Sequence, residues 1–285
     1  MARPSPDPSQ THRVSHRKNN TGPRDFARAG SKDMASRVLA INSLLAALPD
    51  ATYQRLVGDL TPVNLTLDMA LYEPGKAMRF IYFPIDCVLC VLTSVDGRKP
   101  VTVGLIGFEG MLGVSVALGV ADSFVQVVVQ SPGTALRMGA ARFRKELQQC
   151  PALQQVIFRY AGAKLAQVRQ AVACQCYHEA KERFACFLLM TSDRLRSEVF
   201  RQDQDSVAAM LGITRPTVSI CAGDLRQRKL ISYSRGRIRI VDRNQLEAVA
   251  CDCYRHGKIL NTLSERSAEC SEPIAANREP PRRIR

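Results

Sequence analysis

The sequence predicts an α+β protein with three parts: a small antiparallel β-roll (jelly-roll-like), a long helix, and a helical domain that ends in a β-hairpin. Three observations predict this fold. Six or seven short apolar strands separated by turn residues occupy the first half of the chain. An uninterrupted helical period then runs from Pro151 to about Tyr177. Two short helices and a basic hairpin follow it.

The composition is typical of a protein that folds around a hydrophobic core in water. Of 285 residues, 46% are hydrophobic and 23% are charged. No apolar run reaches the ~18 residues that a membrane span needs, and the longest candidate, Gly110–Ala121, is too short. The N-terminus is polar and Pro-rich and lacks an apolar signal region. We therefore expect a cytoplasmic protein without a membrane partner, whose ten cysteines are reduced thiols.

The net charge of +14 is distributed unevenly along the chain. Residues 34–150 carry ten Lys/Arg against nine Asp/Glu, whereas residues 151–257 carry seventeen against ten. A nearly neutral segment joined to a basic one is typical of a sensing module attached to a nucleic-acid reader. The predicted division is a disordered basic arm (1–33), a sensor domain (34–150), a dimerisation helix (151–178), a DNA-binding domain (179–257) and a flexible tail (258–285).

The elements of the first half follow from their periodicity. Ser36–Leu48 is a short amphipathic helix stopped by Pro49, and Ala51–Leu60 adds one or two helical turns. Glu73–Lys76 and Asp96-Gly97 are turn signals, the second a strong hairpin signal. The alternating segments between these turns and beyond them predict strands over Asn64–Tyr72, Ala77–Phe83, Cys87–Val95, Pro100–Ile106, Ser123–Gln130 and Thr134–Met138, the last two separated by Ser131–Gly133.

After a short helix over Ala140–Gln149, the long helix carries an apolar stripe. At about 1.5 Å per residue, it is nearly 40 Å long, which is more than a small barrel can bury. Its length and its position between two modules therefore predict a homodimer that pairs through this helix. The predicted dimer interface consists of Leu153, Val156, Ile157, Tyr160, Leu165, Val168 and Val172. A further helix over Glu179–Thr191 turns Phe184, Phe187, Leu188 and Leu189 toward a second core.

A helix-turn-helix follows. Asp203–Leu211 reads as a helix, Gly212 breaks it, and Thr214 caps a second helix that has Pro216 in its first turn. The small Ala208 lets the two helices approach each other. Leu230–Tyr233 and Ile238–Val241 form a hairpin directly after the second helix, which makes the domain a winged helix-turn-helix. The predicted DNA-binding residues are Thr214, Arg215, Thr217, Ser219, Arg226, Arg235, Arg237 and Arg239.

Several short stretches carry a family resemblance. They are Tyr72–Gly75, Ile81–Pro84, Gly107–Gly113, Val129–Gly133, Glu182–Phe184, Leu188–Arg194, Met210–Ile213, Arg215–Val218 and Leu230–Ile238. On these stretches, the chain from about Asn42 to Tyr254 resembles the Crp/Fnr superfamily of bacterial transcription regulators. The resemblance implies a cyclic-nucleotide-binding-like β-roll, a homodimer on palindromic promoter DNA, and RNA polymerase as a partner. Many such regulators have Glu directly after the recognition-helix Arg and a second Arg further along; this chain has Pro216 and Ile220, so we expect a different half-site.

The sensor departs from the family's cyclic-nucleotide cassette, which places an Arg about ten residues after a Gly-Glu turn. Glu109-Gly110 lies in that region, but neither Lys nor Arg occurs between Lys99 and Arg137. A buried phosphate without a cation is costly. We therefore expect an unknown small-molecule effector other than cAMP or cGMP, in an apolar pocket suited to an uncharged molecule. The predicted pocket residues are Phe83, Val103, Glu109 and Leu112.

We expect neither a cofactor nor a metal site. No cysteine precedes Cys87, where iron–sulfur members of the family place several. In Cys87-x-x-Cys90 an alternating strand turns the two thiols to opposite faces. Cys174-x-Cys176 and Cys251-x-Cys253 lack the usual histidine or cysteine partners, and His178 is expected to make core hydrogen bonds. A thiol redox-responsive regulator remains an alternative, because a disulfide needs just two nearby cysteines.

Two other classes of protein compete with a regulator. An enzyme on a cupin-like barrel needs two or three histidines and a carboxylate around a metal, but no histidine lies between His16 and His178. Since no phosphate-binding loop is present either, we expect no enzyme. A β-roll interaction module without DNA binding is the other alternative, and the basic wing argues against it. The effector, the operator, the target genes and the choice between activation and repression remain open.

Overall fold

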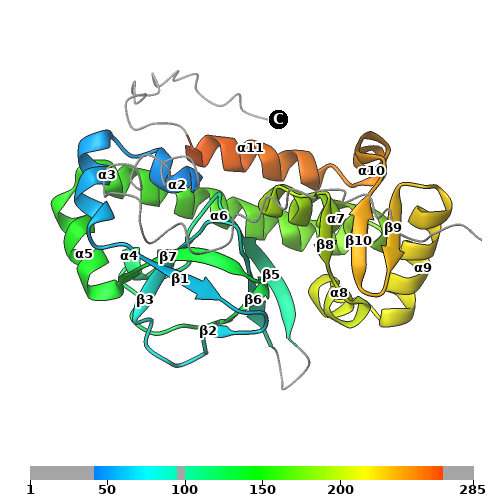
Figure 1. Cartoon of the computed structure of the whole chain (residues 1–285), viewed down its shortest axis with the longest axis horizontal. Coiled ribbons are helices and arrows are strands. Elements are labelled where there is room, and N and C mark those ends of the chain that lie inside the picture. The colour runs from blue at the N-terminus through cyan, green and yellow to red at the C-terminus, as the bar shows by residue number, and fades with distance from the viewer. Residues whose placement is uncertain (1–41, 95–99, 266–285) are drawn as a thin grey trace, which may run out of the picture.

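The computed structural model describes residues 42–94 and 100–265. A β-roll lies at one end, a winged helix-turn-helix at the other, and the long helix α6 (Pro151–Tyr177) connects them (Figure 1). The predicted α+β fold class is confirmed. Among the described residues, no helix is long and apolar enough to cross a membrane.

Two antiparallel sheets form the β-roll. One has the strand order β1-β7-β3 and the other β2-β6-β4-β5. Their bounds are β1 Thr61–Leu65, β2 Ala70–Tyr72, β3 Phe80–Pro84, β4 Val88–Thr93, β5 Val101–Ile106, β6 Gln126–Ser131 and β7 Gly133–Gly139. Short helices flank the sheets: α2 Ser43–Ala46, α3 Asp50–Val57, α4 Val114–Ala117 and α5 Ala140–Gln149. The antiparallel pairing of β4 with β5 fits the hairpin expected there, although Asp96-Gly97 lies outside the described residues.

The turn expected at Ser131–Gly133 does not join a hairpin. β6 pairs with β4 and β2, whereas β7 pairs with β1 and β3, so the chain passes from one sheet to the other at Pro132. Proline cannot donate a ladder hydrogen bond, which suits a position where one ladder ends. Periodicity and turn residues look the same for a hairpin and for such a crossing.

The core of the roll extends into the long helix. Leu153, Val156, Ile157 and Tyr160 are at most 2% exposed and pack with the buried strand residues in one cluster. The first half of α6 therefore buries its apolar stripe inside its own chain. The two sheets and this half of the helix share one hydrophobic core, which stabilises the roll.

The C-terminal domain contains a three-stranded sheet of order β8-β10-β9. Its elements are α7 Ala180–Leu195, β8 Val199–Arg201, α8 Gln204–Leu211, α9 Arg215–Gln227, β9 Ile231–Ser234, β10 Arg237–Ile240 and α10 Arg243–Val249. The turn between β9 and β10 has positive φ at both central residues, 50° at Arg235 and 71° at Gly236. This backbone suits a two-residue hairpin loop. The wing is therefore a tight hairpin with an arginine at its tip.

The winged domain packs against the roll. Val88, Cys90 and Leu105 belong to strands β4 and β5, yet they cluster with the buried residues of α7, α8 and α9. Gln130 of β6 also donates a hydrogen bond to Gln202 of the winged domain at 2.9 Å. An apolar cluster that crosses from one domain to the other holds the two together.

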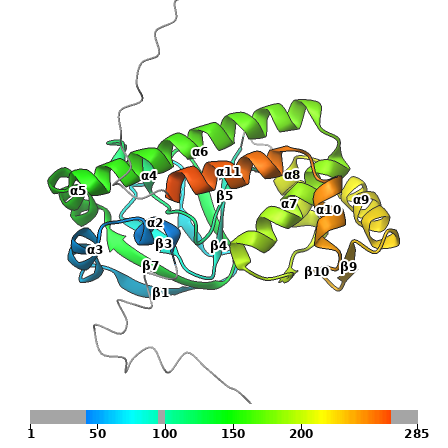
Figure 2. The same ribbon diagram turned by 90° about the horizontal axis from the view of Figure 1, so that it is seen from above.

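The last described helix, α11 (Cys253–Glu265), lies along α6 (Figure 2). The expectation of a flexible tail from residue 258 is therefore wrong for residues 258–265. The reason is tertiary, because Gln167 of α6 donates a hydrogen bond to Asn261 at 2.7 Å. The expected arm 1–33, the start of the helix expected at Ser36, and residues 266–285 lie outside the described residues.

Candidate DNA interface and interdomain pocket

The helix-turn-helix forms as the sequence predicts. Asp203 caps α8 by accepting a hydrogen bond from Ser206 N at 2.8 Å. Gly212 ends α8 with a φ of 61°, the left-handed region that glycine adopts without strain. Thr214 then caps α9, accepting from Thr217 N at 3.4 Å. Because α8 ends at Gly212 and α9 begins after Thr214, α9 is a separate helix, and Arg215, Ser219 and Arg226 are exposed on it.

Four of the expected DNA-binding residues meet in one polar groove of about 360 Å³ between α8, α9 and the wing. They are Arg215, Ser219, Arg226 and Arg235. All four are exposed. Thr214 and Thr217 stand at the start of α9 with their hydroxyl oxygens 2.8 Å apart. The groove thus combines the short hydroxyl of Ser219 with three guanidinium groups, side chains that contact base edges and phosphates.

Arg237 and Arg239 lie elsewhere. They line a separate groove of about 1330 Å³ on the side that faces the roll, together with Asp68 and Pro132. The alternation of strand β10 explains this, because Ile238 and Ile240 point into the core. Arg235, at the tip, lines both grooves. The expected set of eight residues is therefore divided between two faces.

The expected dimer stripe is also divided. Its first four residues, Leu153 to Tyr160, are buried in the core of their own chain and are unavailable to a partner. Leu165, Val168 and Val172 are exposed by 53%, 45% and 61%. Phe158 is 48% exposed and was not predicted. The apolar stripe is therefore buried within the chain up to Tyr160 and exposed from Leu165 onward.

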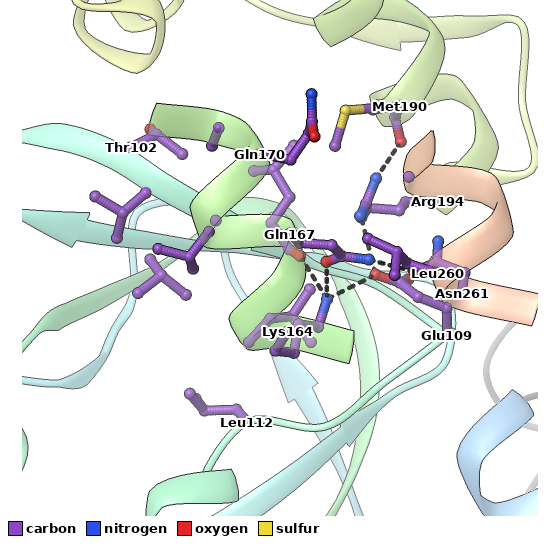
Figure 3. Close-up of a pocket in the computed structure, with 18 of the residues that line it drawn as sticks. Thr102, Glu109, Leu112, Lys164, Gln167, Gln170, Met190, Arg194, Leu260 and Asn261 are labelled. Carbon is purple, nitrogen blue, oxygen red and sulfur yellow. Dashed lines mark hydrogen bonds and ion pairs between the residues drawn. The ribbon is translucent and has the colours of Figure 1, made fainter. Parts of the chain in front are cut away.

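A pocket of about 590 Å³ lies between the roll, α6, α7 and α11 (Figure 3). Val103, Glu109 and Leu112 line it, as the sequence predicts. Phe83 is not among the lining residues, because it is 2% exposed and belongs to the core of the roll. The prediction for Phe83 is therefore wrong. The lining also includes Leu260 and Asn261 of the unexpected helix α11.

Glu109 joins the roll to the winged domain through a buried ion pair. Arg194 of α7 donates from Nε to the Glu109 carboxylate at 2.9 Å, and the two side chains are 6% and 4% exposed. Gly107 N donates to the same carboxylate at 3.0 Å. Burial alone would raise the pKa of Glu109, but Arg194 and Lys164 hold it below its ordinary value. Glu109 therefore stays ionised and is committed to a contact between domains.

Lys164 of α6 completes this arrangement. Its Nζ lies 3.6 Å from the Glu109 carboxylate and 3.1 Å from Gln167 Oε1. Burial lowers the pKa of Lys164 to about 8, against the opposing effect of Glu109. Sequence reasoning missed Lys164, but its position gives a signal: it continues the buried stripe of Ile157 and Tyr160 at helical spacing. A lysine on a buried face calls for an acidic partner.

Two glycines allow this packing. A Cβ on Gly107 would lie 2.8 Å from the Arg194 side chain, and one on Gly110 would lie 2.3 Å from the Tyr160 hydroxyl. That hydroxyl accepts from Met111 N at 3.1 Å and donates to Met111 O at 3.0 Å. Gly107 and Gly110 are thus required for the close approach of the roll to α7 and α6.

Two sets of cysteines bear on the predictions. Cys87 packs in the core of the roll and Cys90 in the interdomain cluster, so the two thiols face opposite sides as predicted. Burial raises the pKa of Cys87 to about 12 and of Cys90 to about 11, which disfavours the reactive thiolate. The expectation that the two C-x-C pairs lack partners is wrong. Cys174, His178, Cys251 and Cys253 bring their ligand atoms within 4.8 Å of one another.

Comparisons with known proteins agree with this architecture. Residues 182–249 match the family described as the Crp-like helix-turn-helix domain. The global nitrogen regulator of Nostoc sp. is 22% identical over 206 residues, which cover 68% of this chain and 92% of that protein. FixK2 from Bradyrhizobium japonicum has a similar fold, with a TM-score of 0.60 at 13% identity over 67% of this chain and 98% of that one. A regulator from Eubacterium rectale that is assigned to the Crp/Fnr family also has a similar fold, with a TM-score of 0.58 at 14% identity over 72% of this chain and 96% of that one.

The fold of the chain is similar to that of a regulator assigned to the Crp/Fnr family, and residues 182–249 match a Crp-like helix-turn-helix domain. The expected family resemblance is confirmed.

Proposed function

We propose that the chain is a homodimeric regulator that binds palindromic promoter sites in double-stranded DNA. The observation that carries this proposal is the polar groove in which Arg215, Ser219, Arg226 and Arg235 meet. Arg215 stands at the first residue of α9, where a side chain reaches base edges in the major groove. Arg235 at the wing tip is placed to contact phosphate. Asp205, which lines the same groove, lies 3.6 Å from Arg215 Nε.

The exposed part of α6 supports the dimer. Phe158, Leu165 and Val172 follow one another at seven-residue intervals, and Val168 lies three residues after Leu165. This is the a/d spacing of a coiled coil. Helix α11 packs along α6 (Figure 2), and Phe158, Leu165 and Val172 are not among the residues that line the pocket between them, whereas Val168 is. A second copy of the helix would cover the stripe, and two-fold symmetry would present two recognition helices to two half-sites.

The pocket supports a small-molecule effector that is neutral and largely apolar. The cations nearest to Glu109, which are Lys164 and Arg194, are already paired with its carboxylate. A cyclic phosphate would have to compete with that carboxylate for them. The residue ten positions beyond Glu109 is Gly119, so the arginine of the family's cassette is absent from this loop.

The division into sensor, dimerisation helix and DNA-binding domain is part of this proposal, as are RNA polymerase as a partner and the cytoplasm as the location. The partner and the location both follow from the proposed binding to promoter DNA, which RNA polymerase also binds and which lies in the cytoplasm. The packing of α6 supports this division, because the first half of the helix belongs to the core of the roll and its second half carries the exposed apolar residues that we assign to the dimer interface.

A randomised-site selection with the full chain tests the proposal. The wild type should select a two-fold symmetric motif, and Arg215→Ala should flatten base preference at one or two positions, about 1–3 kcal/mol of discrimination. Arg235→Ala should weaken all sequences alike and lower the slope of log affinity against log salt by about one. Arg144→Ala, an exposed arginine on helix α5 of the roll, is the control and should change neither quantity.

Selection of no motif would contradict sequence-specific binding. An unchanged motif for Arg215→Ala would show that α9 is not the recognition helix. An asymmetric, single half-site motif would contradict the dimer.

A further inference from the structure

Four potential metal ligands meet where the long helix ends and α11 begins. Cys174 and His178 lie one turn apart at the end of α6, and His178 N donates to Cys174 O at 3.1 Å. Residues four apart on a helix present their side chains on one face. Cys251 and Cys253 come from the segment between α10 and the start of α11. Two separate parts of the chain, 73 or more residues apart, therefore supply one cluster.

The separations within the cluster match one tetrahedral ion. With Zn–S bonds of about 2.3 Å and a Zn–N bond of about 2.0 Å, tetrahedral angles place two sulfurs ~3.8 Å apart and a sulfur and a nitrogen ~3.5 Å apart. Cys174 Sγ lies 3.7 Å from Cys251 Sγ, and Cys253 Sγ lies 3.5 Å from His178 Nδ1. Since all four atoms lie within 4.8 Å of one another, the space between them suits a single ion rather than a multi-iron cluster.

The surroundings of the cluster also fit a metal. Cys251 and Cys253 are buried. Gln170 Nε2 donates a hydrogen bond to Cys253 Sγ at 3.1 Å, the kind of outer contact that orients and stabilises a thiolate ligand. Cys176, two residues from Cys174 on the same helix, is exposed and stays outside the cluster. The spacing Cys174-x-x-x-His178 also lies within the range common in structural zinc sites.

We propose that Cys174, His178, Cys251 and Cys253 bind one structural Zn²⁺ ion. On binding, the three thiols each release a proton to solvent, and His178 coordinates as the neutral imidazole. No electron transfer is involved. The ion would tie the end of α6 to the start of α11. It would thereby fix the segment from which α7 and the winged domain follow, at one end of the pocket that Cys174 and Cys253 help to line.

Zinc content of the purified full chain tests the proposal. Protein from zinc-supplemented cells, dialysed without chelator, should hold about one zinc per chain. Cys251→Ser and His178→Gln should each lower that content at least about fivefold, whereas Cys176→Ser should leave it unchanged. Replacement of zinc by Co²⁺ should give the visible ligand-field bands of a tetrahedral site, together with thiolate-to-cobalt charge-transfer absorption.

A second measurement uses the wild type alone and so does not depend on how the variants fold. Alkylation followed by peptide mass spectrometry should show Cys174, Cys251 and Cys253 protected until a strong chelator removes the metal. Cys176 should react at the same rate throughout.

Three results would overturn the proposal. One is less than about 0.2 zinc per chain after supplementation. Another is zinc content that Cys251→Ser leaves unchanged. The third is protection that a thiol reductant, rather than a chelator, abolishes, because that result would identify a Cys174–Cys251 disulfide and a redox switch in place of a metal site.

Discussion

Replacement of Glu109 by glutamine tests how the winged domain is held against the roll. The substitution keeps an acceptor for Gly107 N but removes the charge that Arg194 pairs with at 2.9 Å. The Arg194 side chain, 6% exposed, would then be buried without a counter-charge. Removal of one partner of a buried pair costs roughly 3–5 kcal/mol. We expect Glu109→Gln to lower the free energy of unfolding by about 3 kcal/mol, near the lower end of this range. The reason is that Lys164, whose pKa is already lowered to about 8, can lose its proton more easily than an ordinary lysine and so adds less unpaired charge.

Urea unfolding at fixed protein concentration measures this loss. Arg194→Met should cost a similar amount, and the double variant should cost less than the sum by on the order of 2 kcal/mol, since the two residues contact each other. Glu73→Gln is the control: its carboxylate pairs with Lys76 at 2.7 Å on the surface, and the change should stay within ~0.5 kcal/mol.

The pH dependence gives a second criterion. Because the folded-state pKa of Glu109 lies below its ordinary value of 4.5, the wild-type advantage over Glu109→Gln is complete above that pH. The advantage should be lost as the pH falls through the lowered pKa. A loss of less than about 1 kcal/mol at neutral pH, with no change in the difference on acidification, would refute the role assigned to this ion pair.

Three further predictions concern the helix α6 and the pocket. Relative to Lys164→Met, the wild type should gain stability as the pH rises from about 8 toward 10.5, because in this range the unfolded lysine binds more protons than the folded one. Urea unfolding at several pH values measures the difference in free energy of unfolding between the two proteins. A difference that does not change with pH would contradict the prediction. Leu165→Glu should convert a dimer into a monomer at micromolar concentration in sedimentation, whereas the exposed Arg144→Glu should not. Calorimetry with cAMP and cGMP should show no micromolar binding, and a micromolar dissociation constant would contradict the pocket chemistry.

Local signals predicted the elements well. The long helix, the cap at Thr214 and the wing all follow from periodicity and from capping residues, which act within one or two turns. Most strands of the roll were also located, but the single strand expected over Asn64–Tyr72 is in fact two, β1 and β2, which lie in different sheets, and the crossing between sheets at Pro132 was not predicted. Whether two neighbouring strands pair or pass to different sheets depends on the distant strands that β6 and β7 meet.

The site was predicted in part for the same reason. Arg215 and Arg235 face one groove because the fold places the wing beside α9, whereas Arg239 faces the roll. The stripe on α6 was correctly identified as apolar, but its first half is buried inside the chain and its second half is exposed, and no local period distinguishes the two. The cysteine cluster was missed because its two halves, Cys174 with His178 and Cys251 with Cys253, lie more than seventy residues apart in sequence.

The pocket between the roll, α6, α7 and α11 suggests how binding of a ligand is linked to DNA binding. The pocket is lined by the roll through Leu112, by α6 through Gln167, by the winged domain through Arg194, and by α11 through Leu260. A ligand shifts a conformational equilibrium when it binds one arrangement more tightly than another. The pocket has its present shape while Glu109 and Arg194 are paired. We therefore expect a ligand that fills it to stabilise the docked winged domain, and a ligand that separates the pair to favour release of that domain. The Glu109→Gln variant removes that difference, so it should reduce the effect of any effector on DNA affinity by more than it reduces the affinity for the effector itself.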